Sequence, residues 1–194
     1  MTGKILNIPN ILTLSRIALI PVFLLIAYWP PAIGIAGHSG SLLRHIVLAS
    51  LFALAAITDW LDGYLARVMN QSSAFGRFLD PVADKLMVAA SLVVLVQWQP
   101  NIYMAFAAIV IISREITVSA LREWMAELGN RASVAVSMVG KLKTTFQLIS
   151  ITVFLLNIDK LAILSYSLLY IAVLLTLWSM MIYLKAAWPY LKEE

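Results

Sequence analysis

The sequence predicts an all-α integral membrane protein with six transmembrane helices in one bundle. Three observations carry this prediction: the composition, the spacing of long apolar stretches, and the distribution of lysine and arginine. Of the 194 residues, 62% are hydrophobic and only 12% are charged, whereas a soluble domain usually carries about 25% charged residues. The mean hydropathy is correspondingly strongly positive. We expect residues 1–194 to form a single membrane domain.

The apolar stretches divide the chain into six predicted spans, because a helix needs about 20 apolar residues to cross the hydrocarbon layer. Polar or Pro- and Gly-rich breaks separate them, and short breaks favour antiparallel neighbours. The predicted spans are 11–29, 42–68, 75–98, 101–126, 133–157 and 160–186.

The connections and the N-terminus complete this prediction. Residues 30–41, rich in Pro, Gly and Ser, are typical of an outer loop. The segment Asn7-Ile8-Pro9-Asn10 combines residues that favour helix starts. We therefore expect a short interfacial segment at the N-terminus, leading into the first span.

Lysine and arginine predict the orientation, because they stay preferentially on the cytoplasmic side of short loops. With the N-terminus inside, only Arg44 and Lys160 of the 14 basic residues fall on the outer side. Both termini are therefore expected in the cytoplasm. The predicted cytoplasmic set is Lys4, Arg16, Arg67, Arg77, Lys85, Arg114, Arg122, Arg131, Lys141, Lys143, Lys185 and Lys192.

The absence of cysteine excludes disulfides, thiolate metal sites and thiol nucleophiles. Any metal must therefore bind oxygen or imidazole ligands. The two histidines, His38 and His45, fall together in one polar stretch away from the acidic residues, and we interpret them as structural or incidental.

Four aspartates mark the end of the second predicted span and the start of the third. Asp59 and Asp62 are three residues apart, and Asp80 and Asp84 are four apart, so each pair projects from one helix face. Ionisable residues within membrane spans usually serve function. Crowded carboxylates repel each other unless cations lie among them, and oxygen ligands suit Mg²⁺ or Mn²⁺. The pattern predicts a divalent metal site.

A purely structural interpretation is also open. The same aspartates could form salt bridges with nearby Arg67, Arg77 and Lys85 at the helix ends. The regular spacing of four acids at one depth favours the metal site, since salt bridges need neither feature and buried pairs add little net stability.

The segment resembles the signature of the CDP-alcohol phosphotransferases, D-x-x-D-G-x-x-A-R, eight residues, G-x-x-x-D-x-x-x-D. It matches at all eight fixed positions without departure. These positions are Asp59, Asp62, Gly63, Ala66, Arg67, Gly76, Asp80 and Asp84.

This resemblance implies a homodimer and a site for two metal ions at the cytoplasmic face of a bacterial inner membrane. It implies that Asp59, Asp62 and Asp80 bind metal. Asp84 would act as the general base, although a base and a metal ligand need the same side chain, and the sequence leaves both roles open. The CDP group would lie along Gly63, Ala66, Arg67 and Gly76, with Asn10, Thr13 and Arg16 near the nucleotide.

Basic residues in the fourth and fifth spans predict an acceptor site. Arg114 and Arg122 lie eight residues apart, close to two helical turns, and Lys141 stands on the next span. Converging cations suit a phosphorylated acceptor. Ordinary snorkelling to the headgroups is an alternative for cations nearer the span ends, such as Lys143, Arg131 and Lys185.

The segments NIPNILTLSRIALIP, SREITVSALRE and GKLKTTFQ extend the resemblance to bacterial family members that use sn-glycerol 3-phosphate. The resemblance thus implies transfer of a phosphatidyl group from CDP-diacylglycerol to this acceptor, with release of CMP, within membrane lipids and without nucleic acid. One alternative is an inositol-phosphate acceptor in the same family. Another is a small ion or metal transporter, in which the aspartates would bind the transported ion.

Overall fold

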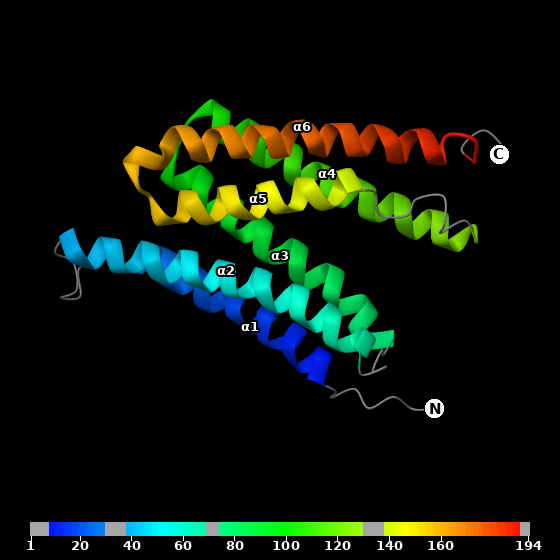
Figure 1. The fold of residues 1–194 in the computed structure, drawn as a ribbon, viewed down its shortest axis with the longest axis horizontal. Coiled ribbons are helices and arrows are strands. Elements are labelled where there is room, and N and C mark those ends of the chain that lie inside the picture. Colours follow the sequence, from blue (N-terminus) through cyan, green and yellow to red (C-terminus); the bar gives the residue numbers. More distant parts are fainter. Residues whose placement is uncertain (1–7, 30–37, 69–73, 130–137, 191–194) are drawn as a thin grey trace. The chain divides into compact units, whose positions relative to one another are not determined.

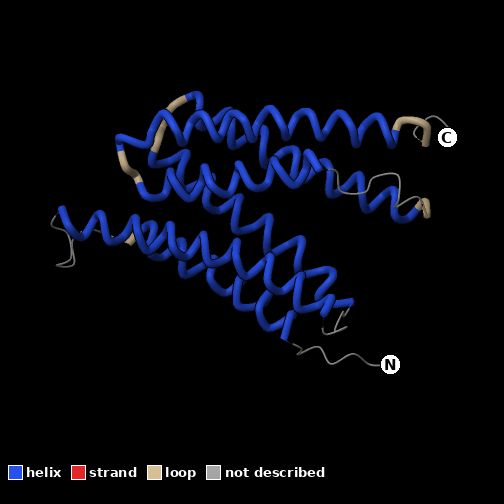
Figure 2. Tube along the Cα trace, in the orientation of Figure 1, coloured by secondary structure: helices blue, strands red, loops and turns tan. Residues whose placement is uncertain are grey.

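The computed structural model describes residues 8–29, 38–68, 74–129 and 138–190, and these residues form helices without any strand (Figures 1 and 2). The all-helical prediction is therefore confirmed. The long helices are α1 (Ile8–Tyr28), α2 (His38–Val68), α3 (Ala74–Trp98), α4 (Ile102–Glu127), α5 (Met138–Leu156) and α6 (Ala162–Ala187), and a short 3₁₀ helix, η2 (Asp159–Leu161), precedes α6.

These six long helices match the six predicted spans to within a few residues wherever both ends are described. Two starts differ most: α2 begins at His38 instead of residue 42, and α5 begins at Met138 instead of residue 133, where residues 133–137 lie outside the described part of the chain. With 31 residues, α2 is about 46 Å long, against a hydrocarbon layer of about 30 Å. Apolar length therefore predicts the membrane-crossing part of α2 but not its polar ends. The predicted interfacial segment, within residues 1–7, lies outside the described residues.

Four stretches within the described helices are long and apolar enough to cross a membrane. They are Asn10–Tyr28, Leu42–Asp59, Ile102–Glu127 and Asp159–Ala187, and Leu142–Leu156 is a shorter apolar helix. These stretches indicate a multi-pass membrane protein. In lipid, a helix of this length satisfies the hydrogen bonds of its backbone groups within itself.

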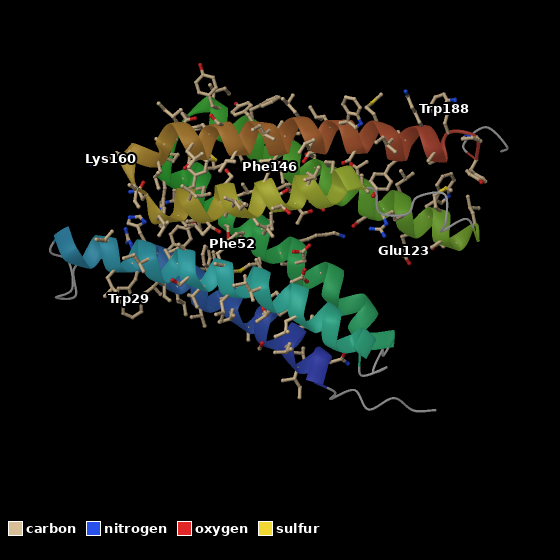
Figure 3. All side chains as sticks on the ribbon, in the orientation of Figure 1. Trp29, Phe52, Glu123, Phe146, Lys160 and Trp188 are labelled. Carbon is tan, nitrogen blue, oxygen red and sulfur yellow. The ribbon has the colours of Figure 1, made fainter. Side chains whose placement is uncertain are left out.

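The chain divides into two compact units. Unit 1 comprises residues 1–98 and 152–159, and unit 2 comprises residues 99–151 and 160–194. In unit 1, α1 packs along both α2 and α3 (Figure 1). Buried Phe23, Leu48, Phe52 and Leu92 form part of its core (Phe52 in Figure 3).

His45 belongs to the packing of unit 1. It is buried, with its Nδ1 3.1 Å from the Leu155 carbonyl oxygen. Its ring meets the Trp98 ring edge-on at a centroid distance of 4.9 Å, and Arg44 lies over the same tryptophan at 5.6 Å. The interpretation of His45 as a structural residue agrees with these contacts.

In unit 2, α4 and α6 pack against each other (Figure 1). Val118, Met125, Tyr183 and Ala187 form a buried cluster between these two helices. The first turn of α4 is capped by Asn101, whose side chain accepts a hydrogen bond from the Met104 amide and donates one to Tyr166. These contacts fix the start of α4, which carries Arg114 three turns further on.

Candidate active site

The helix faces of unit 1 place two signature aspartates next to buried positions. Asp59 follows the buried residues Phe52 and Ala55 on α2 at helical spacing. Asp84 precedes Met87 and Val88 on α3 in the same way. Both carboxylates therefore stand on the side of their helix that faces protein. Ionisable residues of membrane helices that serve function usually face the interior of the bundle in this way.

Asp59 forms an ion pair with Arg16 of α1. Arg16 Nη1 donates to Asp59 Oδ1 over 2.6 Å, with the arginine side chain 1% exposed and the aspartate side chain 43% exposed. A buried guanidinium needs such a partner, since an isolated buried charge is costly. The pair ties α1 to the signature and leaves much of the carboxylate open to further ligands.

The predicted nucleotide residues of α1 share one face. Asn10, Thr13 and Arg16 are spaced by three residues and are all buried. In an otherwise apolar helix, three buried polar side chains in a row mark a polar seam. The structure thus brings this predicted group together and directs its last member at Asp59.

The other signature positions are described only in part. Gly76 is buried within α3. The backbone of α2 carries Asp62, Gly63, Ala66 and Arg67, and that of α3 carries Asp80. Their side chains lie outside the described part of the chain.

The donor chemistry fits Mg²⁺ or Mn²⁺, since the signature supplies carboxylate oxygens and the chain has no cysteine. Among the described side chains, no group of three or more potential metal ligands occurs. Asp59 is the described aspartate that best suits metal binding, because its carboxylate stays nearly half exposed beside its arginine partner.

Arg114 is the central polar residue of unit 2. It lies on the buried face of α4, with 7% of its surface exposed. Its Nη2 donates to Ser179 Oγ over 2.7 Å, and its guanidinium carbon lies 5.5 Å from the centre of the Tyr183 ring. Arg122, by contrast, is exposed. The structure therefore buries one member of the predicted arginine pair and leaves the other at the surface. The Lys141 side chain lies outside the described part.

Glu115 and Lys143 join Arg114 in a charged cluster. Lys143 Nζ donates to Glu115 Oε1, and Arg114 Nη1 lies 3.6 Å from the same oxygen. Lys143 is only 4% exposed, so it does not snorkel to the headgroups in this structure. Among the described side chains, one carboxylate thus faces two buried cations, and a buried cation attracts anions.

Sequence reasoning missed a polar stripe on α5 and α6. Lys143, Gln147 and Ser150 follow each other at helical spacing on α5 and are buried. Thr176 and Ser179 do the same on α6. The available signal was a set of polar residues at spacings of three and four within strongly apolar spans.

Comparison with known proteins identifies the class. The family model described as CDP-alcohol phosphatidyltransferase matches residues 6–178. Because this match spans most of the 194 residues, the chain belongs to the CDP-alcohol phosphatidyltransferase family. The resemblance noted from the signature is confirmed.

Individual relatives narrow the comparison. The chain is 49% identical over 193 residues to the CDP-diacylglycerol–glycerol-3-phosphate 3-phosphatidyltransferase of Pseudomonas fluorescens, covering 97% of this chain and 94% of the relative. It is 48% identical to the enzyme of the same name from Yersinia enterocolitica, covering 97% and 98%. The Pectobacterium atrosepticum enzyme of that name is 46% identical over 186 residues, covering 93% and 94%.

Proposed function

We propose that this protein transfers the phosphatidyl group of CDP-diacylglycerol to sn-glycerol 3-phosphate, forming phosphatidylglycerophosphate and releasing CMP. The observation that carries the proposal is sequence identity. Nearly half of the residues, over almost the whole chain, are identical to those of enzymes named for this reaction. The complete acidic signature and the membrane-length helices support the same chemistry at a lipid substrate.

Asp59, Asp62, Asp80 and Asp84 are the residues that would hold two divalent ions, Mg²⁺ or Mn²⁺. Bound there, the ions would neutralise charge on the attacked phosphate and the leaving CMP. Asp59 would take this role with the part of its carboxylate that stays exposed, while Arg16 donates a hydrogen bond to its Oδ1. A hydrogen-bond donor such as Arg16 fixes the orientation of a carboxylate that binds metal.

Asp84 is proposed as the general base that takes the proton from the acceptor hydroxyl. A positioned carboxylate in this role contributes about 10²- to 10⁴-fold to the rate. The CDP group would lie along Gly63, Ala66, Arg67 and Gly76, where small side chains leave room and the arginine adds positive charge. Asn10, Thr13 and Arg16 form the buried polar face of α1 that would approach the nucleotide.

Arg114, Arg122 and Lys141 are proposed to bind the phosphate of the acceptor. The support is strongest for Arg114, because it is buried within unit 2 and its Nε has no hydrogen-bond partner among the described residues. Guanidinium groups suit phosphate because they donate several hydrogen bonds in a fixed plane.

We further propose that the enzyme is a homodimer in a bacterial inner membrane, with both termini and the active site on the cytoplasmic side. The distribution of lysine and arginine supports this orientation. Labelling of single cysteines, introduced near each terminus of this cysteine-free chain, measures the orientation directly in intact and permeabilised cells.

The testing experiment measures CMP release by the purified protein in detergent micelles with CDP-diacylglycerol and sn-glycerol 3-phosphate. We expect release that requires both the acceptor and Mg²⁺ or Mn²⁺, and that stops when the metal is chelated. Release with inositol phosphate but not with glycerol 3-phosphate would keep the chemistry and replace the acceptor. Absence of CMP with every acceptor, from folded protein, would contradict the proposed reaction.

A further inference from the structure

Two side chains of α6 hold the Arg114 guanidinium. Ser179 Oγ accepts a hydrogen bond from Arg114 Nη2 over 2.7 Å, and the Tyr183 ring lies 5.5 Å from the guanidinium carbon. Ser179 and Tyr183 are four residues apart, so they stand one above the other on one face of α6. Both are buried. One helix therefore supplies both a hydrogen-bond acceptor and an aromatic ring to the arginine.

The Ser179 hydroxyl is itself oriented by the backbone. Its Oγ donates to the Thr176 carbonyl oxygen over 3.0 Å. A serine hydroxyl has a single proton to donate, so this bond turns the oxygen lone pairs away from the carbonyl and leaves them to accept from Arg114. Because Ser179 is 0% exposed, water does not compete for this contact. The acceptor position is thus fixed by the helix.

The guanidinium keeps a donor that the described residues do not use. Arg114 Nε is buried and has no hydrogen-bond partner among them, and Nη1 is 3.6 Å from Glu115 Oε1, beyond hydrogen-bond distance. The Thr176 hydroxyl, one helical turn from Ser179, is also buried without a hydrogen-bond partner there. A buried donor left unsatisfied is costly, and a phosphate oxygen would satisfy it.

We propose that Ser179 and Tyr183 are positioning residues that hold Arg114 ready for the phosphate of the acceptor. This inference rests on the proposed role of Arg114 as a phosphate ligand. A long arginine side chain loses considerable rotamer freedom when it binds a ligand, and fixing it beforehand removes much of that loss. The two α6 residues therefore determine the affinity for the phosphorylated acceptor and leave the transfer step itself unchanged.

The test measures initial rates of CMP release by the full-length protein at varied sn-glycerol 3-phosphate and saturating CDP-diacylglycerol. Ser179→Ala is expected to raise KM for the acceptor about tenfold, since hydrogen bonds to charged groups are among the stronger ones. The value of kcat is expected to stay within about twofold, because uniform binding is what is lost. Activity lost through general misfolding would instead lower kcat.

Matched controls exist on the same helix. Ser165 is equally buried, and its Oγ donates to the Leu161 carbonyl without contacting a charge, so Ser165→Ala should leave KM unchanged. Tyr183→Phe keeps the ring against Arg114 and should also leave KM unchanged. Tyr183→Leu removes the ring and should raise KM severalfold. The tyrosine pair provides the test independently if Ser179→Ala does not yield folded protein.

Arg114→Met separates the positioning role of Ser179 and Tyr183 from the proposed role of Arg114 as a phosphate ligand. It should raise KM more than Ser179→Ala does, and adding Ser179→Ala to it should change KM no further, since the serine acts through the arginine. If Arg114→Met leaves KM unchanged, Arg114 is not a phosphate ligand and the inference falls with that role. If Arg114→Met raises KM while Ser179→Ala and Tyr183→Leu do not, only the positioning role is overturned.

Discussion

The two units build different ionic sites from the same kinds of side chain. In unit 1, one buried cation, Arg16, pairs with Asp59, whose side chain stays 43% exposed. In unit 2, two buried cations, Arg114 and Lys143, face one carboxylate, Glu115, which is 21% exposed. An exposed carboxylate surface attracts further cations, whereas a buried cation such as Arg114 attracts an anion. This difference supports the proposal that unit 1 binds the metal ions and unit 2 binds the phosphate of the acceptor.

The largest expected effect comes from removing a carboxylate of the signature in unit 1. Asp84→Asn keeps the size of the side chain and removes its charge, and we expect turnover to fall by about 10²- to 10⁴-fold. CMP release measures the loss. Asp159→Asn, in the exposed 3₁₀ helix η2, is the matched control and should retain full activity.

A Mn²⁺ titration of the same Asp84→Asn protein separates the two roles left open for this residue. Unchanged metal binding with lost turnover indicates the general base, and weakened metal binding indicates a ligand. Substantial turnover in the variant would contradict both roles.

The next effect concerns the cation of unit 1. Arg16→Gln removes the hydrogen bond that orients Asp59 Oδ1, and we expect the apparent Mn²⁺ affinity to weaken about ten- to a hundredfold, as for other partners of metal ligands. Electron paramagnetic resonance of free Mn²⁺ measures it without turnover. Lys160→Gln, at an exposed site (Figure 3), should leave the affinity unchanged. Tighter binding by Arg16→Gln would show that the arginine competes with the metal.

A smaller effect tests whether Glu115 balances the cations of unit 2. Glu115→Gln removes the carboxylate that Arg114 and Lys143 share. Breaking a fully buried pair costs about 3–5 kcal/mol. Because Glu115 is partly exposed, we expect about 2 kcal/mol, which lowers Tm by about 4–8 °C for a chain of this size.

Thermal unfolding in detergent micelles measures the Glu115→Gln change. Glu123→Gln, at an exposed position of the same helix (Figure 3), should shift Tm by less than about 1 °C, because exposed ion pairs contribute little. Equal shifts in the two variants would mean that Glu115 does not balance the buried cations.

The sequence predicted the helices well because apolar length directly reflects the thickness of the bilayer. It predicted the start of α2 less well, because polar residues such as His38 continue the helix beyond the apolar stretch. The spacing of the aspartates was visible because i,i+3 and i,i+4 neighbours share a helix face. The structure adds what spacing cannot contain, namely that Arg16 reaches Asp59 across 43 residues of sequence.

The contacts of unit 2 were harder to predict, because they too join residues that lie far apart in the sequence. Lys143 near the end of an apolar span is compatible with snorkelling, and only the position of Glu115 on α4 shows that it is paired. Ser179 and Tyr183 lie within the longest apolar run, where the spacing of Ser179 from Thr176 indicates a polar face but not a contact with Arg114. Their importance follows from Arg114, which is 65 residues away from Ser179.

The smallest expected effect concerns the anchoring of α4, the helix that carries Arg114 and Glu115. Asn101→Ala removes the cap on the Met104 amide and the hydrogen bond to the Tyr166 hydroxyl. Loss of an N-cap costs about 1 kcal/mol, so Tm should fall by about 2–4 °C. Asn101→Asp keeps the cap acceptor and removes the donor to Tyr166, and it should recover most of the stability. If Asn101→Asp is as unstable as Asn101→Ala, the bond to Tyr166, and not the cap, is what anchors the start of α4.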